Sequence, residues 1–231
     1  MPDLGGRVVT VALENAYPPF NFIDEESGAA VGWDYDALSE ICLRLNCAPE
    51  FIETSWEGMI SAVSNGEYDM AADGIAYSPE RAELVDFSDF YAVVWQRILV
   101  RLDEDRFGGA EELAAGEYVV GALVASTEYI AAAKLVGEAR VVVYASAEAA
   151  AAGLVAGEVD AVIFDELAGY GYTGIHAVQT KVLADIVTVE ELGFIFPHGS
   201  DLREAVNSAL ARMKVDGALD AITRQWFGED A

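Results

Sequence analysis

Alternating apolar and polar positions predict a chain of the α/β class. Residues 8–12 form a β-branched run typical of a strand, and apolar residues recur at helical spacing over 35–45. A short strand is expected at 51–53, a helix at 56–63 that stops at the following Asn-Gly, and a strand at 68–72. Strands that alternate with helices indicate a mostly parallel sheet, whose functional loops lie at the carboxyl ends of its strands.

A segment of the first half recurs in the second half. Residues 65–72 (NGEYDMAA) are echoed by residues 156–163 (AGEVDAVI), and each copy follows an apolar, helix-like pattern. The two predicted strands end at acids, Asp73 and Asp165. Two copies are too few for a solenoid, so the echo favours two related lobes, whose carboxylates could face each other across a cleft.

Two segments are expected to carry the chain between the lobes. One lies in the apolar run 91–101, and the other precedes two helical patterns near the C-terminus. Helices are expected over 202–213 and 219–226. We therefore expect a discontinuous lobe 1 (1–93 plus 192–231) and a lobe 2 (94–191), with hinges near 92–97 and 188–193.

Charge and composition restrict the partners of the chain. It has 40 Asp and Glu against 13 Lys and Arg, a formal net charge of −27, which argues against nucleic acid. Hydrophobic residues make up 53%, enough for a substantial core, but the longest apolar run is interrupted by Gln96 and Arg97, so no membrane span is expected. The first residues lack a secretion signal, which leaves both a cytoplasmic protein and a mature exported form open.

The two cysteines, Cys42 and Cys47, are five positions apart and would lie apart on an uninterrupted helix. Buried free thiols are the expected state. A disulfide is the alternative if the helix ends near Asn46 in a left-handed cap that folds the chain back. Neither cysteine belongs to a metal-binding pattern, and we expect no metal and no cofactor.

Two predicted helix starts are candidates for binding an anion. Ser78 and Pro79 are typical of an N-cap and first helical position, but Arg81 in the same turn is unfavourable beside the positive end of the helix unless an anion binds there. Arg81 could instead form surface ion pairs. Ser126 and Thr127 begin a second helix, which is either an ordinary cap or a partner of Arg81 in holding one carboxylate.

Three acids follow predicted strands, namely Glu14, Asp73 and Asp165. Each could cap a turn, but together they would form an anionic pocket suited to an ammonium or guanidinium group. Tyr17 and Trp56 follow similar strand ends and could cover such a ligand, although isolated aromatic residues often belong to a core. Motifs of nucleophile elbows, phosphate loops and zinc proteases are absent, so we expect no enzyme activity.

From residue 8 to residue 228 the chain resembles the extracytoplasmic solute-binding proteins of ABC transporters, in the polar amino-acid family. The resemblance is carried by the segments ENAYPPFNF (14–22), GWDYD (32–36), SPER (78–81), VDFS (85–88), GEVDA (157–161) and QWFG (225–228). It implies a periplasmic-binding-protein fold of two α/β lobes joined by two hinge crossings, which close on one amino acid. The resemblance further implies a monomer that lies outside the cytoplasm and delivers its ligand to an ABC permease in the membrane.

The resemblance also implies roles for individual residues. Arg81 would hold the ligand α-carboxylate with help from Thr127, and Asp165 would bind the α-ammonium. Tyr17 and Trp56 would form aromatic walls.

Glu14 would bind the far end of the ligand side chain, and the main chain of Gly74 would contact the ligand. Ala76 departs from the family pattern, where a hydroxyl residue often bonds the carboxylate, so binding of the carboxylate there would be weaker or through the main chain only. Asp73 replaces a small or hydroxyl residue and adds a negative charge.

Glu14 and Asp73 together favour a basic ligand of the arginine and lysine class. If Asp73 points away and caps its loop, a neutral ligand such as glutamine, or another amine, is the alternative. Two readings of other classes remain: a cyclohexadienyl-dehydratase-like enzyme and the sensory domain of a receptor.

Overall fold

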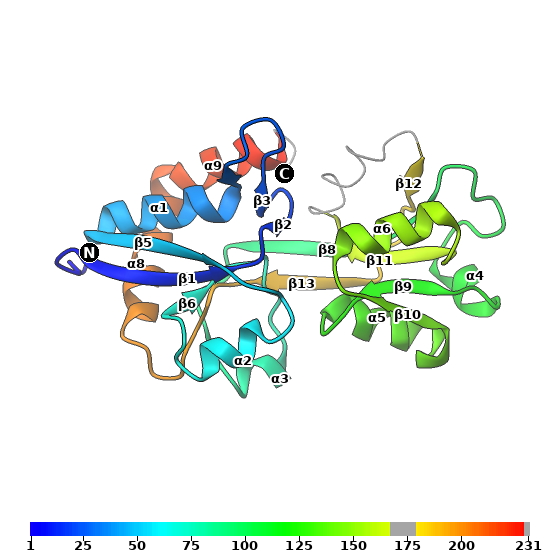
Figure 1. The fold of residues 1–231 in the computed structure, drawn as a ribbon, viewed down its shortest axis with the longest axis horizontal. Helices are drawn as coiled ribbons and strands as arrows, with labels where there is room; N and C mark the ends of the chain where they lie inside the picture. Colours follow the sequence, from blue (N-terminus) through cyan, green and yellow to red (C-terminus); the bar gives the residue numbers. More distant parts are fainter. Residues whose placement is uncertain (167–178, 229–231) are drawn as a thin grey trace. The chain divides into compact units, whose positions relative to one another are not determined.

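The computed structural model describes residues 1–166 and 179–228. The chain divides into two compact units: unit 1 comprises Met1–Val93 and Glu191–Ala231, and unit 2 comprises Val94–Glu190. The boundaries fall inside strand β8 (Ala92–Arg101) and strand β13 (Thr188–Leu192), which pair with each other. The chain therefore passes between the units within paired strands (Figure 1).

Unit 1 is built on a mixed sheet in the order β5-β1-β6-β14-β7. Its strands are β1 (Arg7–Leu13), β5 (Cys47–Glu53), β6 (Met70–Ala71), β7 (Asp86–Phe87) and β14 (Ile195–Phe196). β1 runs parallel to β5 and β6, whereas β14 is antiparallel to β6 and β7. The carboxyl ends of β1 and β6 therefore point the same way and bring Glu14 and Asp73 to one edge of the sheet.

Helices cover both faces of this sheet, with α1 on one side and α2 on the other (Figure 1). The helices of unit 1 are α1 (Trp33–Leu45), α2 (Met59–Ser64), α3 (Pro79–Ala82), α8 (Leu202–Asp216) and α9 (Ala218–Phe227). α1 packs against α8 and α9, and the indole of Trp33 donates to the hydroxyl of Thr223 at 3.0 Å. A small sheet of β2 (Ala16–Tyr17), β3 (Asn21–Ile23) and β4 (Ala30–Val31) precedes α1.

The α2 helix is shorter than the expected helix over 56–63. It begins at Met59 because Gly58, its N-cap, has a φ of 95°, a left-handed conformation that interrupts the helix. Trp56 therefore lies in the loop between β5 and α2. The expected strand 68–72 is likewise reduced to β6, Met70–Ala71.

Unit 2 contains a mixed sheet in the order β10-β9-β11-β8-β12, with β13 also pairing with β8. Its elements are α4 (Ala110–Ala115), β9 (Val120–Leu123), α5 (Thr127–Val136), η1 (Glu138–Arg140), β10 (Val141–Tyr144), α6 (Ala147–Ala156), β11 (Ala161–Asp165) and β12 (Thr180–Val182). Ile98 and Val100 pack with α5, whereas Leu99 packs with α6 on the other face. This alternation along β8 explains why three successive residues, 98–100, are all apolar: both faces are covered.

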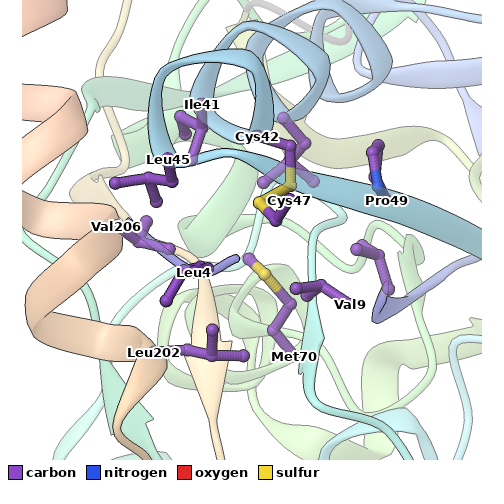
Figure 2. A pocket seen from close by; sticks show the side chains of 12 residues that line it. Leu4, Val9, Ile41, Cys42, Leu45, Cys47, Pro49, Met70, Leu202 and Val206 are labelled. Carbon is purple, nitrogen blue, oxygen red and sulfur yellow. A yellow bond between two sulfur atoms is a disulfide. The ribbon is translucent and has the colours of Figure 1, made fainter. Parts of the chain in front are cut away.

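The expectation of free thiols is wrong, because Cys42 and Cys47 form a disulfide. α1 ends at Asn46 with φ 54° and ψ 56°, and this left-handed cap turns the chain back so that the two Cα atoms lie 4.6 Å apart. Figure 2 shows the disulfide beside a small apolar cavity lined also by Leu4, Met70 and Val206. The bridge therefore joins the end of α1 to the start of β5 at the edge of the unit 1 core.

Candidate functional site

Arg81 is held in place by neighbours within unit 1. Ser78 caps α3, as its sequence predicts, and its hydroxyl accepts the main-chain N–H of Arg81 at 3.2 Å. The guanidinium lies 5.2 Å from the ring centroid of Trp56, and Nη1 donates to the carbonyl oxygen of Ala76 at 2.7 Å. Ala76 thus contributes through its main chain, and Arg81 with Trp56 forms a cationic surface backed by an aromatic ring.

Tyr17 and Gly74 pack closely together in the same unit. The ring of Tyr17 stacks on Phe20 with centroids 5.5 Å apart and an interplanar angle of 10°. Gly74 has a φ of 56°, and a Cβ there would lie 2.8 Å from Cε1 of Tyr17 and 3.3 Å from the ring of Phe20. Glycine is therefore required at position 74 both by its backbone and by the close approach of the tyrosine ring.

Glu14 and Asp73, at the carboxyl ends of β1 and β6, are neighbouring carboxylates. Burial raises the pKa of Glu14, and a hydrogen bond from the main chain of Trp56 opposes that shift. Asp73 is more deeply buried, and burial raises its pKa to about 7, against a hydrogen bond from Asn21. The charge of Glu14 contributes to that rise, and a hydrogen bond from the main chain of Glu14 opposes it.

Asp73 is also tied to residues that the sequence analysis did not assign to the site. The amide nitrogen of Asn21 donates to Oδ1 of Asp73 at 2.7 Å and to Oδ2 of Asp34 at 2.9 Å, and all three side chains are buried. Both Asn21 and Asp34 lie in the segments that carry the family resemblance. The available signal was a pair of polar residues, one before and one at the start of the amphipathic α1.

Thr127 and Asp165 lie in unit 2. Ser126 caps α5 as predicted, accepting the N–H of Tyr129 at 3.1 Å, and places Thr127 at the first helical position. Gln96 donates to Oγ1 of Thr127 at 2.9 Å, which leaves the threonine O–H able to donate elsewhere. Asp165 ends β11, where it is buried and paired in register with Gln96 of β8.

Gln96 is a second residue that the sequence analysis missed. It is fully buried, and its Oε1 accepts the hydroxyl of Thr188 at 2.7 Å, so it links β8 to both α5 and β13. A buried glutamine requires such partners, because an unpaired amide is costly in a core. Its interruption of the apolar run 91–101 was the signal that could have identified it.

Two features are absent from the part of the chain that the structure describes. None of the helices formed by the described residues has the length and apolar character that crossing a bilayer requires. Within residues 1–166 and 179–228, no group of three or more His, Cys, Asp or Glu side chains is arranged to hold a metal ion.

Comparisons with known proteins identify relatives of this chain. The L-cystine-binding protein TcyA of Bacillus subtilis (strain 168) is 28% identical over 228 residues, covering 96% of this chain and 82% of the relative. An ancestral arginine-binding protein bound to glutamine is 32% identical, with a TM-score of 0.88 over 96% of this chain and 98% of that structure. An ancestral amino acid-binding protein, a precursor of cyclohexadienyl dehydratase, is 31% identical with a TM-score of 0.85, over 95% of each chain.

These relatives are amino-acid-binding proteins, and the fold they share is the two-lobed α/β fold of that group. The model of the bacterial extracellular solute-binding proteins, family 3, matches residues 9–229. The chain belongs to that family.

Proposed function

We propose that this protein binds a single amino acid with a cationic side chain, of the arginine and lysine class, and delivers it to an ABC importer from outside the cytoplasm. In this proposal it is a monomer, and its two units close on one ligand about hinges near 92–97 and 188–193. The observation that carries the proposal is the pair of opposite charges in unit 1. Arg81 presents a fixed guanidinium, and Glu14 and Asp73 present neighbouring carboxylates.

The guanidinium suits the α-carboxylate that every free amino acid carries. A planar fork held by Trp56 and Ala76 is preorganised for two parallel hydrogen bonds to a carboxylate. In unit 2, the Thr127 hydroxyl would add a donor to the same carboxylate, and Asp165 would accept from the α-ammonium. Tyr17 and Trp56 would enclose the ligand, and Gly74 would contribute through its main chain.

Glu14 and Asp73 support a cationic side chain because two interacting, partly desolvated carboxylates are relieved by a nearby positive charge. The second candidate is a neutral polar amino acid such as glutamine. It is favoured by the hydrogen bond from Asn21 to Asp73 and by a pKa of about 7, which leave Asp73 only partly charged at neutral pH. The glutamine bound to the ancestral arginine-binding relative points the same way.

The decisive experiment is a thermal-shift screen of the twenty amino acids, L-ornithine and L-cystine, followed by calorimetry. A ligand at 100 times its dissociation constant stabilises the folded protein by about 2.7 kcal/mol. For a chain of this size that corresponds to a rise in Tm of about 5–11 °C. Arginine, lysine or ornithine should give the largest shift, and a shift confined to glutamine or cystine would refute the cationic ligand.

Two variants assign the roles. Arg81→Ala should weaken every amino-acid ligand by about 30-fold to several thousand-fold, because the ligand carboxylate loses its charged partner. Glu14→Gln should weaken arginine about 10-fold to 100-fold, and weaken glutamine much less. Arg212→Ala, at an exposed position of α8, is the matched control and should bind as the wild type does. Retained arginine affinity in Arg81→Ala would overturn the assigned role.

Of the two alternatives of other classes, a dehydratase-like enzyme and a receptor sensory domain, one relative makes the enzyme worth testing. Incubation with prephenate or arogenate, followed by detection of the aromatic product, separates it from a binding protein. Turnover would replace the binding proposal. We expect none, because the carboxyl groups of Glu14 and Asp73 have assigned roles in binding.

A further inference from the structure

The carboxylates of unit 1 include one that ligand binding does not use. Asp34, at the start of α1, is fully buried, and its Oδ2 accepts from Asn21 at 2.9 Å. Its Oδ1 has no hydrogen-bond partner among the described residues. Burial raises the pKa of Asp34 well above its ordinary value, against the hydrogen bond from Asn21, and the charge of Asp73 adds to the rise. The oxygen without a partner likewise disfavours the charged form.

The orientation of Asn21 follows from its third contact. Its Oδ1 accepts the main-chain N–H of Asn15 at 2.7 Å, and a main-chain N–H can only donate. The amide nitrogen must therefore face the two acids, giving one hydrogen to Asp34 and one to Asp73. Asn21 thus joins a fully buried acid to the acid beside Glu14, across three separate segments of the chain.

The charged groups on the surrounding elements are engaged elsewhere. Arg44 of α1 pairs with Glu40 of the same helix and with Asp216 at the end of α8. Trp226 of α9 donates to Asp36, and Glu53 at the end of β5 accepts from Asn15.

Tyr35 donates to the side-chain oxygen of Asn15. The negative charge of Glu14 raises the pKa of Asp73, and the negative charge of Asp73 raises the pKa of Asp34. None of these contacts supplies the Asp34 and Asp73 pair with a cation.

We propose that Asp34 and Asn21 are positioning residues for Asp73: Asp34 stays protonated, Asn21 holds Asp73 beside Glu14, and a cationic ligand binds in exchange for the proton of Asp73. The exchange balances, since the ligand brings one positive charge and one proton leaves to solvent. Because it rests on the proposed cationic ligand, the inference deepens the proposed function by making cation binding depend on pH.

The sign of that dependence follows from linkage. The free protein holds the Asp73 proton below about pH 7, and the bound form releases it, so arginine must compete with protons at low pH. With the Asp73 pKa at about 7, arginine affinity should be about tenfold weaker at pH 6 than at pH 8. A neutral ligand has no charge to exchange and should lack this difference.

The first arm of the test needs no ligand. Carboxyl carbon NMR of the ligand-free protein, assigned with Asp34→Asn and Asp73→Asn, follows the two groups from about pH 4 to pH 9. Asp73 should titrate near neutral pH, whereas Asp34 should titrate far above the ordinary value of an aspartic acid and should not lose its proton before Asp73 does. Titration of Asp34 before Asp73, or of Asp73 near its ordinary value, would overturn the inference whatever the ligand is.

The second arm measures arginine binding by calorimetry at pH 6, 7 and 8 in buffers with different ionisation enthalpies. The wild type should release a proton on binding near pH 7, and Asp73→Asn should lose the pH dependence. Asn21→Ser removes a hydrogen bond to the charged form and should move the midpoint up by about one pH unit, which a purely structural role would not do. Asp36→Asn, also in the first turn of α1, is the matched control and should keep the wild-type midpoint.

The possible failures are distinct. If arginine does not bind at any pH, the proposed function fails and the ligand-free titration still decides the state of Asp34 and Asp73. If arginine binds with equal affinity from pH 6 to pH 8 and releases no proton, the proposed function stands and the exchange is refuted.

Discussion

Replacing Gly74 with alanine tests how closely the rings of Tyr17 and Phe20 pack on the loop after β6. The added Cβ would lie 2.8 Å from Cε1 of Tyr17 and 3.3 Å from the ring of Phe20, and the backbone φ of 56° disfavours any side chain. Gly28 offers a matched comparison. Its φ is 69°, but a Cβ there meets nothing within 4 Å.

The two substitutions separate backbone strain from steric overlap. Alanine in the left-handed region costs about 1–2 kcal/mol at either position. At position 74 the overlap with the stacked Tyr17 and Phe20 rings adds about 1–3 kcal/mol, as in other overpacked sites. Gly28→Ala should therefore lower the free energy of unfolding by about 1–2 kcal/mol and Gly74→Ala by about 2–5 kcal/mol.

Thermal unfolding of both variants beside the wild type is the assay. At about 2–4 °C per kcal/mol, Gly74→Ala should melt about 2–12 °C below Gly28→Ala. The displaced tyrosine ring should also weaken ligand binding in Gly74→Ala alone. Equal melting temperatures for the two variants would show that the loop accommodates the added methyl group. The close approach of Tyr17 would then not restrict the residue at position 74.

Two further predictions concern unit 1 away from the ligand. Reducing the Cys42–Cys47 disulfide should lower the free energy of unfolding by about 2 kcal/mol through the entropy of the short loop, and unchanged melting in dithiothreitol would contradict this. Hydrogen bonds to Asp86 and to the Glu83 carbonyl raise the pKa of His198, so this stabilisation is full below its unfolded value, about 6.5, and is lost as the pH rises through the folded value. His198→Gln should abolish that decline in urea titrations at pH 6 and pH 8, and an identical decline in the variant would exclude the imidazole as its source.

Local features of the fold could be predicted because neighbouring residues determine them. Ser78 and Ser126 cap their helices as expected, since an N-cap needs only a hydroxyl and the next turn. The disulfide was predicted wrongly because it depends on where the helix ends, and not only on the spacing of the two cysteines. A spacing of five separates cysteines on a continuous helix, and only the left-handed turn at Asn46 brings them together.

The buried polar networks could not be predicted, because their partners are distant in sequence. Asn21 reaches Asp34 and Asp73, which are 13 and 52 residues away, and Gln96 reaches Thr188, 92 residues away. Hydrophobic periodicity reports which face of an element is buried, but not which polar group it meets there. The sequence identified Asp73 and Thr127 as candidates, whereas Asn21 and Gln96, which donate hydrogen bonds to them, required the structure.

The setting of Arg81 has a consequence for the thermodynamics of the carboxylate binding that we propose for it. A free arginine side chain carries about 2 kcal/mol of rotamer entropy, and ordering it on a ligand would subtract from affinity. Here the ring of Trp56 and the carbonyl of Ala76 already restrict the guanidinium. In the proposed site, the side chain of Arg81 therefore loses its rotational freedom when the protein folds and not when the ligand binds. Substitutions of Trp56 should then change the affinity even if Trp56 does not contact the ligand.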